Sequence, residues 1–318
     1  MLKIGVQSKN IIYDENPAEG FQRLAKAGFD CCDLSLNQYL TNTMLYHMEE
    51  SGFFRRTSKE LQDYFRPHRR AAKESGICIN QMHMPYPAFI PGACESLNDF
   101  LWNEMAPKCM EICHFLECPN IVIHGFKLKD YYGSEQAEWE KTKEFIEYLA
   151  PMAKDMGITI CMENLYNTFG DHIVEGPCCD AAKAAERIDE INRKFGAQVL
   201  GFCFDTGHAN LTGLDMEAFL SVLGDRLKVL HIHDNDGVRD LHQMPFTFTK
   251  VRENTVSTDW EGFLRALARI RFDKVLSFET APILDSFPAG MKQEVLGFIR
   301  QIGVYMAGEI GSKVSDRS

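Results

Sequence analysis

The sequence lacks the patterns that mark membrane, exported and disulfide-stapled proteins. No apolar run approaches the roughly 20 residues that span a bilayer. The opening MLKIGVQSKN has no positively charged stretch followed by an apolar one, as an export signal would. The eleven cysteines form no CxxC pair, which argues against zinc-ribbon and thioredoxin-like sites. We therefore expect a cytoplasmic protein without membrane contact, whose cysteines are buried or free thiols.

Positive charge is scarce as well. Lysine and arginine number 34 against 45 aspartates and glutamates, and the formal net charge is −11. This balance argues against a nucleic-acid partner, because binding to a phosphate backbone depends on clustered lysine and arginine. A local basic groove is still compatible with an acidic total.

A regular alternation of short, apolar, β-rich runs with longer segments of helical period is present instead. The candidate strands are 2–8, 30–36, 77–84, 120–126, 159–164, 199–208, 227–234 and 274–280. The clearest candidate helices are 17–27, 58–75, 135–156 and 180–195. Each of these helices stops before a glycine, which is the residue preferred just past a helix end. The chain therefore reads as eight β–α units.

Eight such units predict an α/β fold in which a single (β/α)8 TIM barrel closes on itself. An open doubly wound sheet would usually carry a GxGxxG turn after the first strand, and here Ser8, Lys9 and Asn10 follow it. We predict a barrel over residues 1–308 and a polar C-terminal tail over 309–318. Long connections follow four of the strands, at 37–57, 85–97, 165–179 and 237–258. They belong to the C-terminal face, where barrel enzymes place their active sites.

Residues able to bind a metal recur at the ends of the third to eighth candidate strands. They are His83, His124, Glu163, Asp205, His208, His231, His233 and Glu279. A lone histidine at a strand end is usually structural, but strand ends converge in a closed barrel and the joint pattern favours a site. Because inward residues recur at every second position, Glu163, Asp205 and His231 share the parity that faces the barrel mouth.

The three carboxylates Glu163, Asp205 and Glu279 would repel one another in one cavity unless a cation neutralised them. Mixed carboxylate and imidazole ligands suit Mn²⁺, Co²⁺, Fe²⁺ or Zn²⁺, whereas an oxygen-only set would favour Mg²⁺ or Ca²⁺. We predict one divalent metal ion, with Mn²⁺ as the first choice and Co²⁺, Mg²⁺, Fe²⁺ or Zn²⁺ as alternatives.

Several stretches resemble the xylose-isomerase-like barrel superfamily, which contains sugar isomerases and epimerases, inosose dehydratases and endonuclease IV. They are MENLY at 162–166, FDTGHANL at 204–211, HIHDNDGVRDLH at 231–242, TDWEGFLRAL at 258–267 and SFET at 277–280. The resemblance covers nearly the whole chain. It is specific for the superfamily and less so for a reaction.

For a ketose epimerase of this group, the resemblance implies one metal bound by Glu163, Asp205, His231 and Glu279. The two glutamates would remove and return a proton on opposite faces of a substrate carbon, while the metal stabilises an enediolate. The implied partner is a small sugar or sugar derivative, and we expect a homo-oligomer, with or without another kind of subunit. The predicted substrate contacts are His83, His124, His208, Arg239, Asp240 and His242. The sequence agrees equally well with Arg239 being a solvent-exposed loop residue that does not contact the substrate.

Two alternatives remain within the same resemblance. Metal-dependent lyases, namely inosose dehydratases and enzymes that cleave 3-keto C-glycosides, begin with the same proton abstraction. Endonuclease IV, a three-zinc AP endonuclease, has ligands at every corresponding position. In this sequence they are His83, His124, Glu163, Asp205, His208, His231, Asp240, His242 and Glu279. The sugar reading is preferred because the segment after His242 departs from that enzyme and no evident basic stripe is present.

Overall fold

Eight parallel strands form the inner wall of the protein in a computed structural model that describes residues 2–128, 134–248 and 257–315. The strands are β1 (Lys3–Gln7), β2 (Cys31–Ser35), β3 (Cys78–His83), β4 (Asn120–Ile123), β5 (Thr159–Glu163), β8 (Leu200–Asp205), β9 (Leu227–His231) and β10 (Val275–Phe278). Each predicted strand contains one of them. Their order in the sheet is β10-β1-β2-β3-β4-β5-β8-β9.

Backbone hydrogen bonds just beyond β9 and β10 close the sheet. The Ile232 N–H donates to the Ser277 carbonyl at 2.9 Å, and the Glu279 N–H donates to the Ile232 carbonyl at 3.0 Å. The first and last strands of the chain, β1 and β10, are paired in parallel. The predicted closed (β/α)8 barrel is therefore confirmed.

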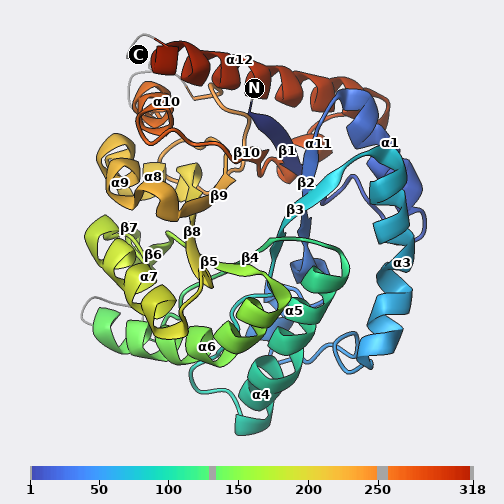
Figure 1. The fold of residues 1–318 in the computed structure, drawn as a ribbon, viewed down its shortest axis with the longest axis vertical. Helices are drawn as coiled ribbons and strands as arrows, with labels where there is room; N and C mark the ends of the chain where they lie inside the picture. The colour runs from blue at the N-terminus through green and yellow to red at the C-terminus, as the bar shows by residue number, and fades with distance from the viewer. Residues whose placement is uncertain (1, 129–133, 249–256, 316–318) are drawn as a thin grey trace.

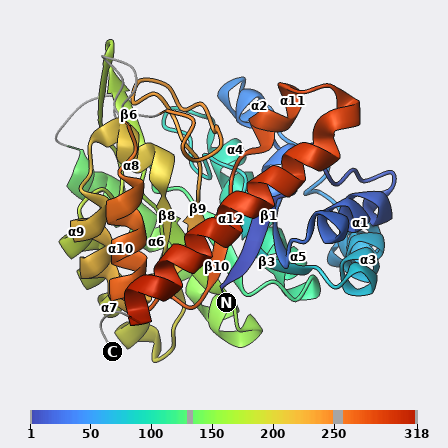
Figure 2. The same cartoon turned by 90° about the horizontal axis from the view of Figure 1, so that it is seen from above.

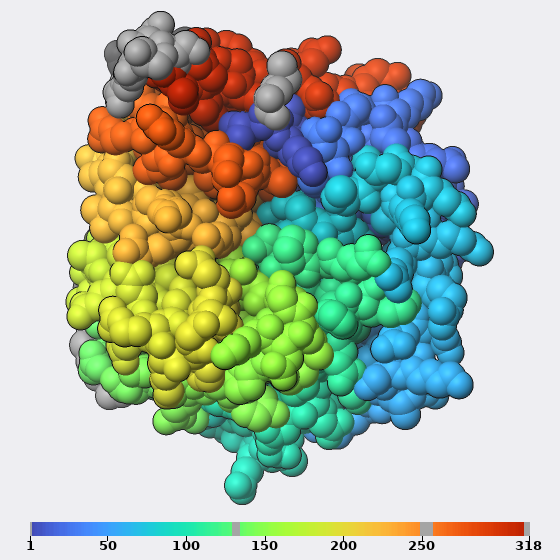
Figure 3. Space-filling view, viewed as in Figure 1, coloured from blue at the N-terminus to red at the C-terminus, as the bar shows by residue number. Residues whose placement is uncertain are grey.

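Helices surround the strands as a ring (Figure 1). The longer ones are α1 (Pro17–Ala27), α3 (Ser58–Ser75), α5 (Ala106–Phe115), α6 (Glu135–Met156), α7 (Ala181–Phe195), α9 (Met216–Leu223), α10 (Trp260–Arg269) and α12 (Lys292–Ser315). Shorter ones are α2 (Asn42–Tyr46), α4 (Glu95–Phe100), α8 (Thr206–Thr212) and α11 (Ala281–Asp285). In the space-filling view the side chains of the described residues fill the centre of the ring (Figure 3).

The four predicted helices end where the glycines indicate. Gly28, Gly76, Gly157 and Gly196 follow α1, α3, α6 and α7 with φ of 88°, 69°, 67° and 60°. This left-handed conformation costs glycine little because it has no Cβ. The fourth helix begins one residue later than predicted, since the Asp180 carboxylate caps it by accepting the N–H groups of Ala182 and Lys183.

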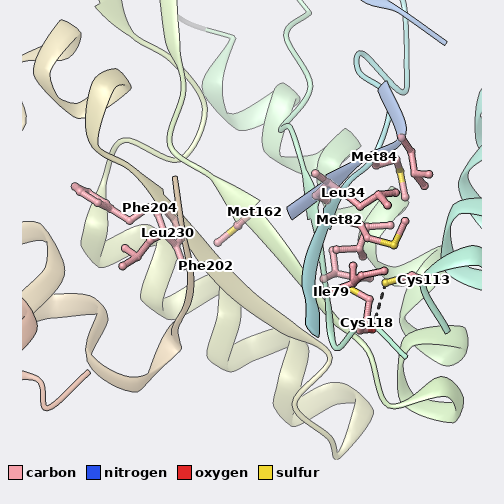
Figure 4. Close-up of a cluster of buried hydrophobic side chains, with 14 of the residues drawn as sticks. Leu34, Ile79, Met82, Met84, Cys113, Cys118, Met162, Phe202, Phe204 and Leu230 are labelled. Carbon is pink, nitrogen blue, oxygen red and sulfur yellow. Dashed lines mark hydrogen bonds between the residues drawn. The ribbon is translucent and has the colours of Figure 1, made fainter. Parts of the chain in front are cut away.

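The main hydrophobic core lies between the strands and the helices. Leu34, Met82, Met162, Phe204 and Leu230 belong to it and are at most 2% exposed (Figure 4). A second, smaller cluster consists of Val122, Cys161, Cys203 and Val229. All eleven cysteines are free and nine of them are buried, as expected. Among the described residues, no helix is long and apolar enough to cross a membrane.

Local structure differs from the sequence predictions in three places. The connection 165–179 contains an antiparallel hairpin of β6 (Tyr166–Phe169) and β7 (His172–Glu175). Residues 206–208 continue the predicted sixth strand as helix α8 rather than as strand. The predicted boundary at residue 308 falls inside α12.

Figure 2 places β6, α2 and α11 at one end of the barrel, away from the N-terminus. Of the connection 237–258, residues 249–256 lie outside the described ones.

Candidate active site

The ends of β5, β8, β9 and β10 bring four predicted metal ligands together. The His231 Nδ1 atom lies 3.3 Å from Glu163 Oε1, 3.3 Å from Glu279 Oε2 and 3.9 Å from Asp205 Oδ2. Glu163, Asp205 and His231 are at most 1% exposed, and the Glu279 side chain is 13% exposed. Strand parity therefore predicted correctly that these side chains meet at the barrel mouth.

A second group contacts the other oxygen of Glu163. His83 at the end of β3 and His124 just after β4 place their Nε2 atoms 3.5 and 3.2 Å from Glu163 Oε2. The two Nε2 atoms are 3.2 Å apart. Because burial disfavours its charged form, the pKa of His124 falls to about 4. Burial opposes the charged form of His83 too, but Glu163 outweighs it and raises the pKa of His83.

A third group lies around Asp240. His208 Nε2 and His242 Nε2 are 3.4 and 3.2 Å from Asp240 Oδ2. The backbone N–H of His208 donates to Asp205 Oδ1 at 2.6 Å, because Asp205 is the N-cap of α8. Against the cost of burial, contact with Asp240 raises the pKa of His242 to about 9. These residues place positive and negative charge close to the four-residue group.

Several buried polar atoms of the site lie near charged neighbours but make no hydrogen bond of normal geometry with the described residues. They are Glu163 Oε2, both ring nitrogens of His231, and Asp240 Oδ1. An unpaired buried polar atom costs roughly 1–3 kcal/mol, so this arrangement is unfavourable unless a further group satisfies it. Asp205, His231 and Glu279 each present a ligand atom within 4.8 Å of the others. The donor set therefore fits a divalent cation.

Electrostatics within the group favour an ionised Glu163. Burial alone would raise its pKa, but His231 and His124 outweigh burial and hold the pKa well below the usual range. Burial likewise opposes the charged form of His231, but the carboxylates of Glu279 and Glu163 outweigh it and raise the pKa of His231. Cys203 also lies near His231 and Glu163, but burial raises the pKa of its thiol well above 9.0. Cys203 is therefore a neutral neighbour.

Sequence reasoning missed two residues of the site, Gln7 and Asp33. The Gln7 side chain at the end of β1 donates from Nε2 to Glu279 Oε1 at 2.7 Å. Asp33, on β2, is 1% exposed, and its Oδ2 lies 3.9 Å from His231 Nε2. Burial raises the pKa of Asp33 to about 6. Both occupy strands whose ends carried no histidine, but Asp33 was visible as an acidic residue inside an apolar run.

His233 and Arg239 have different places. His233 is fully buried, and its Nε2 lies 3.0 Å from Asp205 Oδ2. It therefore orients the carboxylate of Asp205. The Arg239 side chain is exposed, and its backbone N–H donates to Asp236 Oδ1 at 2.8 Å. Arg239 thus lies on a solvated loop, which was the alternative to its prediction as a substrate contact.

A cavity of about 650 Å³ opens above the polar group. Its floor includes His124, His208 and Asp240. The Tyr86 ring lies 3.8 Å from the His124 ring, and the Tyr166 ring lies 5.2 Å from the His208 ring. The cavity therefore reaches His124 and His208, the two histidines that contact Glu163.

Comparison with known proteins agrees with this architecture. An uncharacterized protein of Methanocaldococcus jannaschii is 26% identical over 290 residues, covering 90% of this chain and 86% of that protein. A D-psicose 3-epimerase superposes with a TM-score of 0.67 at 16% identity, covering 96% of this chain and 100% of that one. The 3-keto-D-glucoside 4-epimerase YcjR of E. coli superposes with a TM-score of 0.65 at 15% identity, covering 95% of this chain and 100% of that one. The sequence model of one family matches residues 21–302, so the chain belongs to the xylose isomerase-like TIM barrel family.

Proposed function

We propose that the protein is a divalent-metal-dependent sugar isomerase or epimerase in which Glu163 and Glu279 exchange a proton with the substrate. The observation that carries this proposal is the convergence of the two carboxylates. Glu163 Oε1 and Glu279 Oε2 both lie 3.3 Å from one atom, Nδ1 of His231. They come from β5 and from the end of β10, so they approach His231 from different parts of the barrel wall.

The chain's own residues prepare each glutamate for a different task. His231 and His124 keep Glu163 ionised, so its carboxylate carries no proton, as both a metal ligand and a general base require. Gln7 holds Oε1 of Glu279 and leaves Oε2 facing the site. His233 and the N-terminus of α8 fix the two oxygens of Asp205. These contacts restrict the carboxylates to one arrangement, as acid–base catalysis requires.

A divalent ion would be held by Glu163, Asp205, His231 and Glu279 and would stabilise negative charge on substrate oxygens. Mn²⁺ remains our prediction for this ion. The structural neighbours, a D-psicose 3-epimerase and a 3-keto-D-glucoside 4-epimerase, support a sugar as the substrate. Lyase action on an inosose or a 3-keto C-glycoside would begin with the same proton removal. Product analysis with such substrates therefore belongs to the first screen.

Solvent exchange tests the two glutamates directly. Metal-loaded protein is incubated in D₂O with a panel of ketoses, inososes and 3-keto glycosides, and deuterium at carbon is measured by mass spectrometry. We expect Glu163→Gln and Glu279→Gln each to lower incorporation by at least about 100-fold. Glu144→Gln, at a glutamate on the outside of α6, serves as the matched control. Circular dichroism checks folding, and normal exchange in either site variant would refute the two-glutamate mechanism.

A second candidate is metal-dependent phosphodiester cleavage, and the group formed by His83, His124 and Glu163 favours it. Their ligand atoms are 3.2 to 3.5 Å apart. Tetrahedral zinc with bonds of about 2.0–2.1 Å needs a similar ligand spacing. Elemental analysis of protein purified without added metal separates the candidates. Three zinc ions per chain with cleavage of abasic DNA would favour the endonuclease, whereas one exchangeable ion without cleavage would favour the sugar enzyme.

A further inference from the structure

We propose that the outer part of the cavity is a subsite for an apolar, preferably aromatic, group joined to the sugar. The substrate class is then a glycoside rather than a free or phosphorylated sugar. This inference rests on the proposed function for the position of the sugar, which would lie above Glu163. The subsite itself rests on the size of the cavity, the chemistry of its wall and the placement of four aromatic rings.

The cavity is larger than one sugar ring requires. Its volume of about 650 Å³ lies within the range of roughly 300–1,000 Å³ that is usual for pockets enclosing drug-sized ligands. A monosaccharide held against the polar floor would leave much of this space to water. Water beside apolar walls is readily displaced by an apolar group, which gains affinity by doing so.

The wall differs in chemistry from the floor. The floor carries the polar residues already described, whereas the wall combines aromatic and aliphatic side chains with Asn42 and Lys127. The main wall residues are Tyr46, Tyr86, Phe89, Ile90, Leu165 and Tyr166. A free ketose carries a hydroxyl or carbonyl on each carbon and would face this wall with groups that need hydrogen bonds. An aglycone would instead bury apolar surface there.

The aromatic rings mark a path outward from Glu163. His124 approaches Glu163 Oε2, and His208 Nδ1 lies 3.3 Å from Glu163 Oε1. Tyr86 packs on His124 and Tyr166 packs near His208, so the two tyrosines flank the approach to the carboxylate. A substituent leaving a sugar at Glu163 would pass between them. Flat rings bind such a group by offset or edge-to-face stacking.

The rim of the cavity carries two further rings. Tyr46, on the short helix α2, is 66% exposed although it lines the cavity. Phe89 is half-buried and lies in the connection after β3. Aromatic groups at a concave site, one exposed and one half-buried, are typical of ligand-binding surfaces. These two rings are suited to cover the far end of an aglycone.

The charges of the wall argue against a phosphorylated sugar. Among the described residues that line the cavity, Lys127 is the only lysine or arginine. Its Nζ already donates to the Tyr166 carbonyl at 2.6 Å. Phosphate sites commonly use arginine forks or several backbone N–H groups. A single lysine with a prior hydrogen bond provides less than this.

Binding of unreactive glycosides tests the subsite without requiring turnover. Isothermal titration of the metal-loaded protein compares phenyl with methyl β-D-glucopyranoside, and the same pair of galactosides, with glucose 6-phosphate as the charged probe. We expect the phenyl glycoside of at least one pair to bind about tenfold more tightly than its methyl partner. Tyr46→Ala and Phe89→Ala should each remove most of that preference. Phe298→Ala, at an exposed ring on α12, is the matched control and should keep it.

The outcomes separate this inference from the proposed reaction. Equal affinity for phenyl and methyl glycosides, tighter binding of glucose 6-phosphate, or no binding of any probe would overturn the subsite. A phenyl preference that depends on Tyr46 and Phe89 would support it even if no sugar exchanges deuterium. In that case the proposed reaction would fail while the subsite stands.

Discussion

Two levels of the same barrel strands differ sharply in chemistry, although both are inside the protein. The lower level is a small apolar cluster: Val122, Cys161, Cys203 and Val229. Two residues further along the same strands, the upper level is polar: His124, Glu163, Asp205 and His231. Cys161 and Glu163, for example, are 0% and 1% exposed. Burial is therefore nearly equal except at His124, whose side chain is 17% exposed, and the main change is in the side chains.

The difference shows where the barrel gains stability and where it holds reactive groups. Each lower side chain removes apolar surface from water and needs no partner. The upper side chains include buried atoms that no described residue satisfies, such as Glu163 Oε2 and the nitrogens of His231. Such atoms oppose folding on their own, and sites that bind or catalyse commonly carry this cost. Variants that touch one level at a time test the division.

The largest effect is expected for Asp205→Asn. Asparagine can still accept the His208 N–H and cap α8, so the change mainly removes a negative charge from the upper level. We expect the affinity for Mn²⁺ to fall by at least about 100-fold, as measured by isothermal titration. Cys161→Ala, in the lower level of the neighbouring strand, is the control and should retain the ion. An Asp205→Asn protein with normal affinity would remove Asp205 from the ligand set.

Asp33→Asn should have opposite effects on stability and on metal affinity. The pKa of Asp33 is raised from 3.8 to about 6, chiefly by burial. Its ionised form therefore costs stability, and that cost is absent below pH 3.8, grows between pH 3.8 and 6, and is constant above. Replacement by Asn should increase the unfolding free energy of the metal-free protein by roughly 1–3 kcal/mol at pH 8 and leave it unchanged near pH 3.5.

The same variant should bind Mn²⁺ about 10–100-fold more weakly, because a carboxylate behind a ligating histidine strengthens and orients it. Asp33 Oδ2 lies 3.9 Å from His231 Nε2. Urea titrations at the two pH values and a metal titration measure the two effects. Equal gains in stability at both pH values would show that the charge of Asp33 is not responsible.

The sequence was sufficient for the barrel and for the convergence of most candidate site residues because both follow from short-range patterns. Alternating runs and terminal glycines located the strands and helices, and parity directed Glu163, Asp205 and His231 inward. The antiparallel hairpin of β6 and β7 was not predicted, since a short polar loop segment forms strands only when its two halves pair. His208 was assigned to a strand end, but the Asp205 carboxylate starts helix α8 two residues earlier.

The contacts of Gln7 and Asp33 were beyond sequence reasoning for a different reason. Gln7 meets Glu279, which is 272 residues away, only because β1 and β10 are neighbours in the closed sheet. A glutamine at a strand end carries no metal-binding signal of its own. Its role depends on the partner that the fold supplies, and the sequence does not state that partner.

Gln7→Leu should lower kcat by about tenfold while KM and metal affinity change little. The hydrogen bond from Gln7 fixes one oxygen of Glu279, and leucine would leave that carboxylate free to rotate away from the reacting atoms. Steady-state kinetics on the substrate found in the exchange screen provide the measurement. Gln301→Leu, on the outer surface of α12, is the control. A parallel loss of bound metal would instead assign Gln7 a structural role.

The smallest functional effect is expected for Val229→Ala, two residues before His231 on β9. Val229 is 2% exposed. Removal of its two γ-methyl groups should reduce the unfolding free energy by about 1–2 kcal/mol. Because the Val229 side chain makes no polar contact with a ligand, Mn²⁺ affinity and kcat should stay within about twofold of wild type. Urea unfolding and metal titration measure both quantities. If affinity fell along with stability, packing in the lower level would be setting the position of His231, and the two levels would act as one unit.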